Sequence, residues 1–362
     1  MSNRGTEPVA VDDVRGDADR SATERAEQEG LEAGSSRGGR VWELLSSSVG
    51  RNLGLLVGLA LLCVVGFATA GERFLSESNL ITVLLLASVI GVVSVGMTFV
   101  ITGGGIDLSV GAIVALSSIW CTTLSVQATG RDVGWLTMAF SALAVGAVCG
   151  LINGTLIAYG GVVPFVATLA MLASARGYAE ILSNRRTQIV DVPGFTDALN
   201  ARPLGVPMLV VIFLVVAALG WVLLNRTTFG RRTVAVGGNP EAARLAGINV
   251  KRHTVLLYVL LGMCCGIAAL MIVARTTTGS STHGGGYELD AIAAVVIGGT
   301  LIAGGRGTIV GTVLGVLIFT TLTNVFTLND RSTSEQALIK GVIIVVAVLL
   351  QQRLAERKVA KT

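Results

Sequence analysis

Asp107 and Ser109 are the residues of this sequence whose types and positions point most directly to chemistry. They follow three glycines in the apolar stretch VITGGGIDLSVGAIVAL, residues 100–116, and these are Gly103, Gly104 and Gly105. A carboxylate in such a stretch normally faces a protein interior, where it can cap a helix, contact a polar solute or carry a proton. Each glycine weakens a helix by roughly 1 kcal/mol relative to alanine. We therefore expect a broken helix, with Ser109 capping the next one and Asp107 near its positive end.

A second apolar stretch is interrupted in the same way. It is AVVIGGTLIAGGRGTIVGTVLG, residues 294–315, and its first break contains Gly298, Gly299 and Thr300. Paired glycine-interrupted segments in a membrane protein point to a transport path, because irregular backbone at membrane depth must face protein or a water-filled cavity. We expect both breaks to line a translocation pathway. Three further candidates also have an alternative role in helix packing, and they are Asn153, Phe165 and Thr168.

The composition indicates an all-α membrane protein with many spans. The 362 residues are 52% hydrophobic and 14% charged, with a mean hydropathy of +0.73, whereas a soluble domain is about 25% charged. The apolar runs are continuous and too long for the strands of a membrane barrel. About ten helical segments are expected, at 52–70, 80–101, 108–125, 134–158, 162–182, 207–224, 254–274, 290–303, 308–327 and 336–350.

The distribution of charge predicts which side of the membrane each loop and terminus faces. The loop 225–253 has six basic residues and one acidic residue, and the tail after 350 has four basic residues and one acidic residue. Both are therefore expected in the cytoplasm, and the number of crossings places the N-terminus there too. We predict a disordered cytoplasmic tail at 1–45, a transmembrane permease domain at 46–351 and a cytoplasmic tail at 352–362. The outer loops are then 71–79, 126–133, 183–206, 275–289 and 328–335.

Outside its polar N-terminal tail, the sequence has none of the patterns that would indicate catalysis. GxxxxGK[ST] and HExxH do not occur, and GxSxG occurs only as GSSRG at 34–38 in the polar tail. There are only two histidines, and the five cysteines form no CxxC pair. These patterns would mark an ATP site, a zinc site, a nucleophilic serine or a redox pair. We expect no catalytic residue, no metal, no cofactor on this chain and no nucleic-acid partner.

The basic loop 225–253 contains a short helix signal. Asn239 is an N-cap candidate, Pro240 and Glu241 suit the first turn, and Gly247 suits the residue after the helix. So short a helix is unstable alone and needs a surface to pack against. It is either a turn held on the membrane surface or a docking helix for a cytoplasmic partner. At the outer side, Arg176 and Glu180 are four apart and are expected to pair.

Four stretches, in order, resemble the permease subunits of bacterial ABC importers for monosaccharides of the ribose, xylose and galactose type. They are TGGGIDLSVG, NGTLIAYGGVVPFVATLAML, TTFGRRTVAVGGNPEAARLAGINV and GYELDAIAAVVIGGTLIAGGRGTIVGTVLG. The resemblance covers about residues 45–350. It implies a homodimer, or a heterodimer with a related permease, in the bacterial cytoplasmic (inner) membrane.

The resemblance also implies the partners and their contact residues. Two copies of a separate ATPase, which holds ATP and Mg, would lie below the permeases, and an extracytoplasmic sugar-binding protein above. The coupling helix that contacts the ATPase corresponds to the loop with Gly230, Arg231, Gly237, Asn239, Glu241, Ala242 and Gly247. Glu288 and Asp290, near the outer surface, are expected to contact the binding protein, with a helix cap as the alternative for Asp290.

The expected function is import of a small sugar, driven by ATP on the partner. A neutral sugar needs hydrogen-bonding groups more than charges, and intramembrane charges are scarce here. The alternatives are an ABC permease for a nucleoside, a sugar alcohol or a branched-chain amino acid. A proton-coupled secondary transporter is a further alternative, in which Asp107 would be the proton site.

Overall fold

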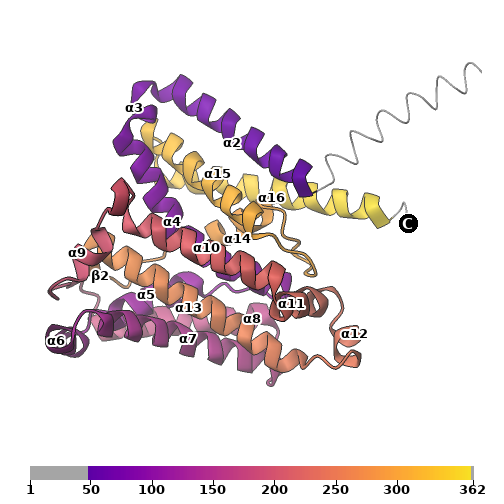
Figure 1. The fold of residues 1–362 in the computed structure, drawn as a ribbon, viewed down its shortest axis with the longest axis horizontal. Coiled ribbons are helices and arrows are strands. Elements are labelled where there is room, and N and C mark those ends of the chain that lie inside the picture. Colours follow the sequence, from indigo (N-terminus) through magenta and orange to yellow (C-terminus); the bar gives the residue numbers. More distant parts are fainter. Residues whose placement is uncertain (1–47, 360–362) are drawn as a thin grey trace, which may run out of the picture. The chain divides into compact units, whose positions relative to one another are not determined.

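The computed structural model describes residues 48–359, and most of that chain is helical (Figure 1). The predicted tail at 1–45 lies outside the described residues, as do the last three residues of the tail predicted at 352–362. The elements are α2 (Ser48–Ala70), α3 (Glu72–Leu75), α4 (Glu77–Thr102), α5 (Val110–Cys121), α6 (Leu124–Val133), α7 (Leu136–Ala158), α8 (Pro164–Ser183), β1 (Gln188–Ile189), α9 (Phe195–Asn200), the 3-10 turn η1 (Pro203–Gly205), α10 (Met208–Arg226), α11 (Thr228–Gly238), α12 (Pro240–Leu245), α13 (Val250–Thr276), β2 (Thr278–Gly279), α14 (Tyr287–Ile297), α15 (Ile309–Leu328) and α16 (Thr333–Val359).

Within the described residues, seven helices are long and apolar enough to cross a membrane. The number rises to eight if α5 and α6, which meet at a bend of 60°, form one broken span. The predicted all-α polytopic membrane class is confirmed. The expected count of about ten also includes the short α14 and the less apolar α16, and it stays a prediction.

Both predicted breaks are present, and the same local geometry produces them. Helix α4 ends at the C-cap Gly103, followed by Gly104 at φ +83°, and α14 ends at the C-cap Gly298, followed by Gly299 at φ +88°. In each break the next two amides return to carbonyls of the last helical turn, which is the hydrogen-bond pattern of a Schellman helix end. The segment predicted at 290–303 is therefore wrong in extent, because its helix stops at Ile297.

Helices α4, α5 and α13 contribute most of the buried residues of the main core. Helices α7 and α13 approach so closely that a side chain on Gly146 would overlap the carbonyl oxygen of Gly262, and one on Gly262 would overlap that of Gly146. Small residues of this kind let helix backbones touch in a membrane, where apolar burial alone drives little association. The close pair holds Tyr258 of α13, which is 1% exposed, beside the break after α4.

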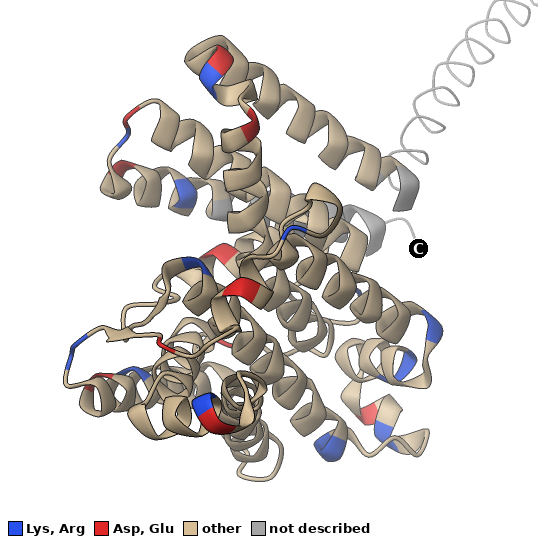
Figure 2. Ribbon diagram, turned by 60° about the vertical axis from the view of Figure 1, so that its left-hand side comes forward, with Lys and Arg blue, Asp and Glu red and all other residues tan. Residues whose placement is uncertain are grey.

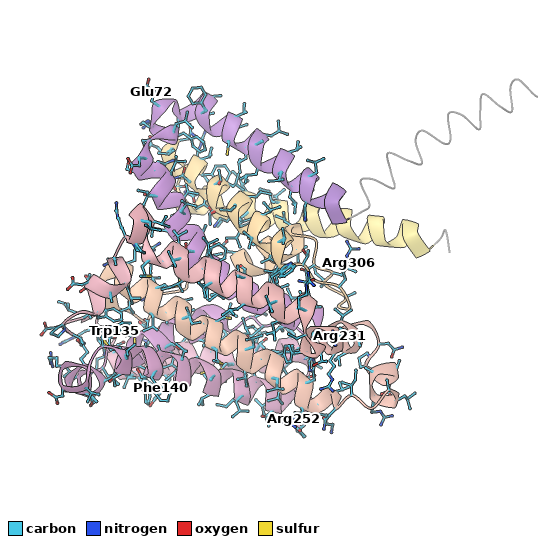
Figure 3. All side chains as sticks on the ribbon, viewed as in Figure 1. Glu72, Trp135, Phe140, Arg231, Arg252 and Arg306 are labelled. Atoms are coloured by element: carbon cyan, nitrogen blue, oxygen red, sulfur yellow. The ribbon has the colours of Figure 1, made fainter. Side chains whose placement is uncertain are left out.

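The elements between the spans gather at two opposite ends. Figure 1 shows α6, α9 and β2 at one end and α11 and α12 at the other. Strand β1 pairs antiparallel with β2, so two loops predicted on the outer side, 183–206 and 275–289, meet each other. Most charged residues lie at helix ends and in loops (Figure 2). Arg231, Arg252 and Arg306 lie near the α11–α12 end, whereas Glu72 and Trp135 lie at the other (Figure 3).

Candidate functional site

Asp107, Ser109 and Asn153 form one buried polar cluster. Their exposed fractions are 1%, 0% and 0%. Asp107 Oδ1 accepts hydrogen bonds from the backbone amide (2.7 Å) and the hydroxyl (2.5 Å) of Ser109. From α7, the Asn153 Nδ2 group donates to Asp107 Oδ2 (3.3 Å) and to Ser109 Oγ (3.0 Å). The structure thus joins the carboxylate of the first break to the asparagine that the sequence singled out, across two helices.

Ser109 does not cap α5 as predicted. It is the N-cap residue by position, but its backbone is already helical (φ −88°, ψ −4°) and its side chain makes no capping hydrogen bond. The hydroxyl donates to Asp107 instead, and the carboxylate satisfies the Ser109 amide two residues on, as in an Asx turn. Asp107 therefore organises the helix start, and Ser109 links it to Asn153.

The unwound chain between α4 and α5 is supported from α13. The hydroxyl of Tyr258 donates to the carbonyl oxygen of Ile106 at 3.1 Å. Backbone polar groups freed by a helix break must find partners at membrane depth. Asp107 and Tyr258 supply them here, and Asn153 holds the side chains of Asp107 and Ser109. Side chains from three segments therefore hold the break in one conformation.

A cavity of about 810 Å³ lies next to this cluster, between α5, α7 and α8. Its lining is mostly apolar and includes Trp120, Phe140, Asn153 and Tyr178. Among the described residues, the Oδ1 atom of Asn153 has no hydrogen-bond partner. The polar cluster thus meets the cavity through Asn153.

The other pathway candidates do not join this cavity lining. Phe165 is exposed on α8, and the buried hydroxyl of Thr168 donates to the Pro164 carbonyl at 2.9 Å. Gly298 lies against the backbone of Gly311 in α15. Thr300 is buried, and its hydroxyl accepts a hydrogen bond from the Thr308 amide at 3.3 Å. The structure therefore separates the candidates into the polar cluster at the first break, the second break, and helix α8, where Phe165 is exposed and Thr168 is buried.

The loop between α10 and α13 forms the predicted short helix. Asn239 caps α12 by accepting a hydrogen bond from the Ala242 amide at 3.0 Å, and Gly247 follows the helix with φ +83°. Glu241 pairs with Arg244 at 3.0 Å on the exposed side. Both predicted helix signals are confirmed.

The residues matched to a coupling helix have two different orientations. Five are exposed or border the exposed face, and these are Arg231, Asn239, Glu241, Ala242 and Gly247. Gly230 and Gly237 face inward, since a side chain on Gly230 would overlap the Leu224 carbonyl and one on Gly237 would overlap the Thr102 carbonyl. The sequence pattern did not separate these two groups.

Glu288 and Asp290, which were predicted to contact the binding protein, lie against other parts of this chain. Asp290 pairs with Lys340 of α16 at 3.0 Å, with both side chains less than one fifth exposed, and a side chain on Gly111 would come within 2.6 Å of the Glu288 carboxylate. The predicted pairing of Arg176 with Glu180 is wrong, because Arg176 donates to the carbonyls of Ser281 and His283 and Glu180 pairs with Arg185. Carbonyls of a folded loop offered Arg176 better geometry than an exposed neighbour on its own helix.

Residues 79–348 match the family model described as the permease component of branched-chain amino acid transport systems. The chain belongs to this permease family. It is 39% identical over 305 residues to the ribose import permease protein of Escherichia coli (strain K12), covering 83% of this chain and 92% of the relative. The corresponding Bacillus subtilis (strain 168) protein is 40% identical over 305 residues, covering 84% and 93%. The L-arabinose ABC transporter permease protein of Azospirillum brasilense is 38% identical over 320 residues, covering 88% and 90%.

No solved structure matches the chain significantly. The family match and the membrane-spanning helices together identify the chain as a multi-pass membrane permease, a component of a transporter rather than an enzyme. Among the described residues, no group of histidine, cysteine, aspartate and glutamate side chains is arranged to hold a metal ion. The features of this permease that can act on a solute or a partner are the polar cluster at the first break, the adjoining cavity and the exposed α12.

Proposed function

We propose that this permease is the transmembrane subunit of an ATP-driven importer for a small sugar resembling ribose, in the cytoplasmic membrane of a bacterium. The observation that carries this proposal is the similarity to permeases named for ribose and arabinose over about nine tenths of their length. The family description names branched-chain amino acids, which keeps an amino-acid solute as the alternative to test.

The described polar groups support a neutral solute. Asp107 is the carboxylate next to the cavity, and its two oxygens already accept three hydrogen bonds from Ser109 and Asn153. A zwitterionic amino acid needs charged partners of both signs, whereas a sugar needs donors and acceptors. We therefore assign Asp107 and Ser109 to holding the first break, and Asn153 to the boundary between that break and the path.

The shape of α12 supports docking of a separate ATPase. Of its six residues, Ala243 is buried, whereas Leu245 is 83% exposed. A six-residue helix has no stability of its own, and an exposed leucine at its end gives a partner an apolar contact. We propose that Arg231, Asn239, Glu241, Ala242 and Gly247 border this docking surface, and that the partner holds ATP and Mg.

The loops at the two opposite ends of the helices support the proposed orientation in the membrane. The β1–β2 pair joins loops 183–206 and 275–289 at the end opposite α12 (Figure 1). We propose that this end faces the sugar-binding protein and that both termini are cytoplasmic, with about ten crossings if α14 and α16 are counted. A second permease, identical or related, completes the transporter, and Glu288 and Asp290 lie near the binding-protein side.

Paired leucine variants test the docking surface. Leu245→Asp changes an exposed residue of α12, and Leu204→Asp changes a fully exposed leucine in the loop at the opposite end. Each permease is purified in mild detergent from its native cell, and ATP hydrolysis by the co-purified ATPase is measured. We expect Leu245→Asp to lose the ATPase and Leu204→Asp to retain it. Equal co-purification by the two variants would contradict docking at α12.

Uptake measurements test the solute. Cells that express the intact transporter are given labelled ribose, L-arabinose, leucine or a nucleoside, with and without a protonophore while ATP is maintained. We expect sugar uptake that survives the protonophore. Uptake of leucine in place of the sugars would favour the amino-acid alternative, and loss of uptake with the protonophore would favour proton coupling.

A further inference from the structure

Three glycine-containing segments far apart in the sequence meet backbone to backbone next to α12. They are Gly103–Gly105 after α4, Gly237–Gly238 at the end of α11 and Gly304–Gly305 in the second break, and together we call them the glycine junction. The Gly305 amide donates to the Thr102 carbonyl at 2.9 Å. A side chain on Gly237 would overlap that same carbonyl oxygen and lie 2.6 Å from the Gly305 nitrogen.

The third side of the junction is equally close. Gly304 has φ +85°, and a side chain on it would lie 2.7 Å from the Gly237 carbonyl oxygen and 2.9 Å from the Gly104 Cα. All of these neighbours are backbone atoms, which cannot change rotamer to make room. Close-packed backbones do not deform continuously, so a displacement of one segment must move the other two or break the contact.

The two breaks are also joined to each other around the junction. The hydroxyl groups of Thr98 in α4 and Thr312 in α15 are hydrogen-bonded at 2.8 Å, and a side chain on Gly307 would overlap the Thr102 hydroxyl. The end of α4 and the chain from Gly304 to Thr312 therefore form one unit. Gly237 is the point where the cytoplasmic loop touches that unit.

Gly237 connects α12 to the two broken segments because of its position in the chain. It lies two residues before Asn239, the cap of α12, and Asn239 itself is bonded to the Ala235 carbonyl at 3.0 Å. We propose that Gly237 is a positioning residue that transfers displacement of α12 at once to both broken segments, rather than a contact of the ATPase. This proposal rests on the proposed function, because it takes α12 as the element that the ATPase moves.

The neighbouring glycine supplies a matched control. A side chain on Gly238 would meet its nearest atom, the Gly305 Cα, at 3.9 Å, which is ordinary van der Waals contact. Gly237→Ala and Gly238→Ala thus add the same methyl group to adjacent residues of one helix end. Their helix propensities change equally, so a difference between them reports the junction itself.

The experiment compares the two variants in liposomes that contain permease, ATPase and binding protein. Sugar transported and ATP hydrolysed are measured in the same sample, together with the amount of ATPase bound. We expect both variants to bind the ATPase and hydrolyse ATP, with the ratio of sugar to ATP lowered by about tenfold or more for Gly237→Ala alone. A normal ratio for Gly237→Ala would overturn the proposal. If the intact complex transports no sugar with ATP, the proposed function fails instead.

Hydrogen exchange of the unaltered complex answers the question if Gly237→Ala does not assemble. Peptides covering 100–106, 235–240 and 300–308 are followed with and without a non-hydrolysable ATP analogue. We expect exchange to change in all three segments together, because the Thr102–Gly305 hydrogen bond and the Gly237 contact share one carbonyl. A change confined to 235–240 would overturn the proposal.

Discussion

Replacing Asp107 by asparagine should be tolerated better than replacing it by alanine, although both changes remove the charge. Oδ1 of Asp107 accepts two hydrogen bonds from Ser109, and Oδ2 accepts one from Asn153. Alanine leaves the amide and the hydroxyl of Ser109 without their acceptor in a buried site, whereas the Asn153 NH₂ group keeps Ser109 Oγ. At about 1–3 kcal/mol for each unsatisfied group, Asp107→Ala should lower the free energy of unfolding by roughly 2–6 kcal/mol.

Asparagine keeps the Oδ1 acceptor for both bonds from Ser109. Its new NH₂ group faces Asn153, whose Oδ1 has no partner among the described residues. A rotation of the Asn153 amide therefore lets that oxygen accept the new hydrogen bond. The rotation removes the donation from Asn153 Nδ2 to Ser109 Oγ, now 3.0 Å. One buried NH₂ group then loses its acceptor, which costs about 1–3 kcal/mol, against roughly 2–6 kcal/mol for alanine.

Unfolding of the purified permease in detergent and sugar uptake in cells measure the two variants against the unaltered chain. We expect Asp107→Asn to unfold later than Asp107→Ala and to transport sugar, whereas Asp107→Ala accumulates poorly. A stable Asp107→Asn variant without transport would refute the reasoning, because the charge itself would then be needed. Sensitivity of the unaltered permease to a protonophore, with ATP maintained, would then identify Asp107 as a proton site.

Three further predictions follow from packing and charge. Gly262→Ala places a methyl group against the backbone of α7, and this overpacking should lower the free energy of unfolding by about 1–3 kcal/mol. The loss is measured as a lower unfolding temperature in detergent, and Gly58→Ala, with open space around it, should not show it. Burial, with nearby arginines, lowers the pKa of His283 from 6.5 to about 4. In the unfolded chain His283 therefore takes up its proton at a higher pH than in the folded chain. The free energy of unfolding should fall by about 1 kcal/mol, after discounting for partial exposure, as the pH falls from about 6.5 toward 4. His283→Asn should remove this pH dependence of the melting temperature. Lys340→Met leaves the Asp290 carboxylate unpaired and should destabilise by about 3–5 kcal/mol, and adding Asp290→Asn should restore most of the loss.

The membrane class, both breaks and the α12 helix could be predicted because their signals are local. A run of about twenty apolar residues, a pair of glycines at a helix end and an asparagine followed by proline each act within one or two turns of chain. The structure confirms the ends at Gly103 and Gly298 and the cap at Asn239. The bend between α5 and α6 and the early stop of α14 changed the extents of the segments, since hydropathy alone does not locate a helix end.

The side-chain partners could be predicted less well, because tertiary contacts decide them. Arg176 had a carboxylate one turn away on its own helix, yet it binds carbonyls of the loop after β2. Ser109 had the position of a cap, yet Asp107 takes its hydroxyl. A pair of exposed charges on a helix contributes only a few tenths of a kcal/mol, so a folded loop with free carbonyls readily outweighs it. The Asp290–Lys340 pair joins α14 to α16 and has no local signal.

The glycine junction shows most clearly where local signals end. Each of its three segments has its own local reason for glycine: a helix end after α4, a positive φ at Gly304 and the last turn of α11. Their meeting adds a second reason, because Gly237 leaves room for the carbonyl of Thr102 and the amide of Gly305. The first reason tolerates substitution at a modest cost in helix propensity, whereas the second forbids any side chain. An alanine at Gly237 is therefore a test of tertiary contact, and its difference from an alanine at Gly238 measures how much of the permease's function depends on the three backbones touching.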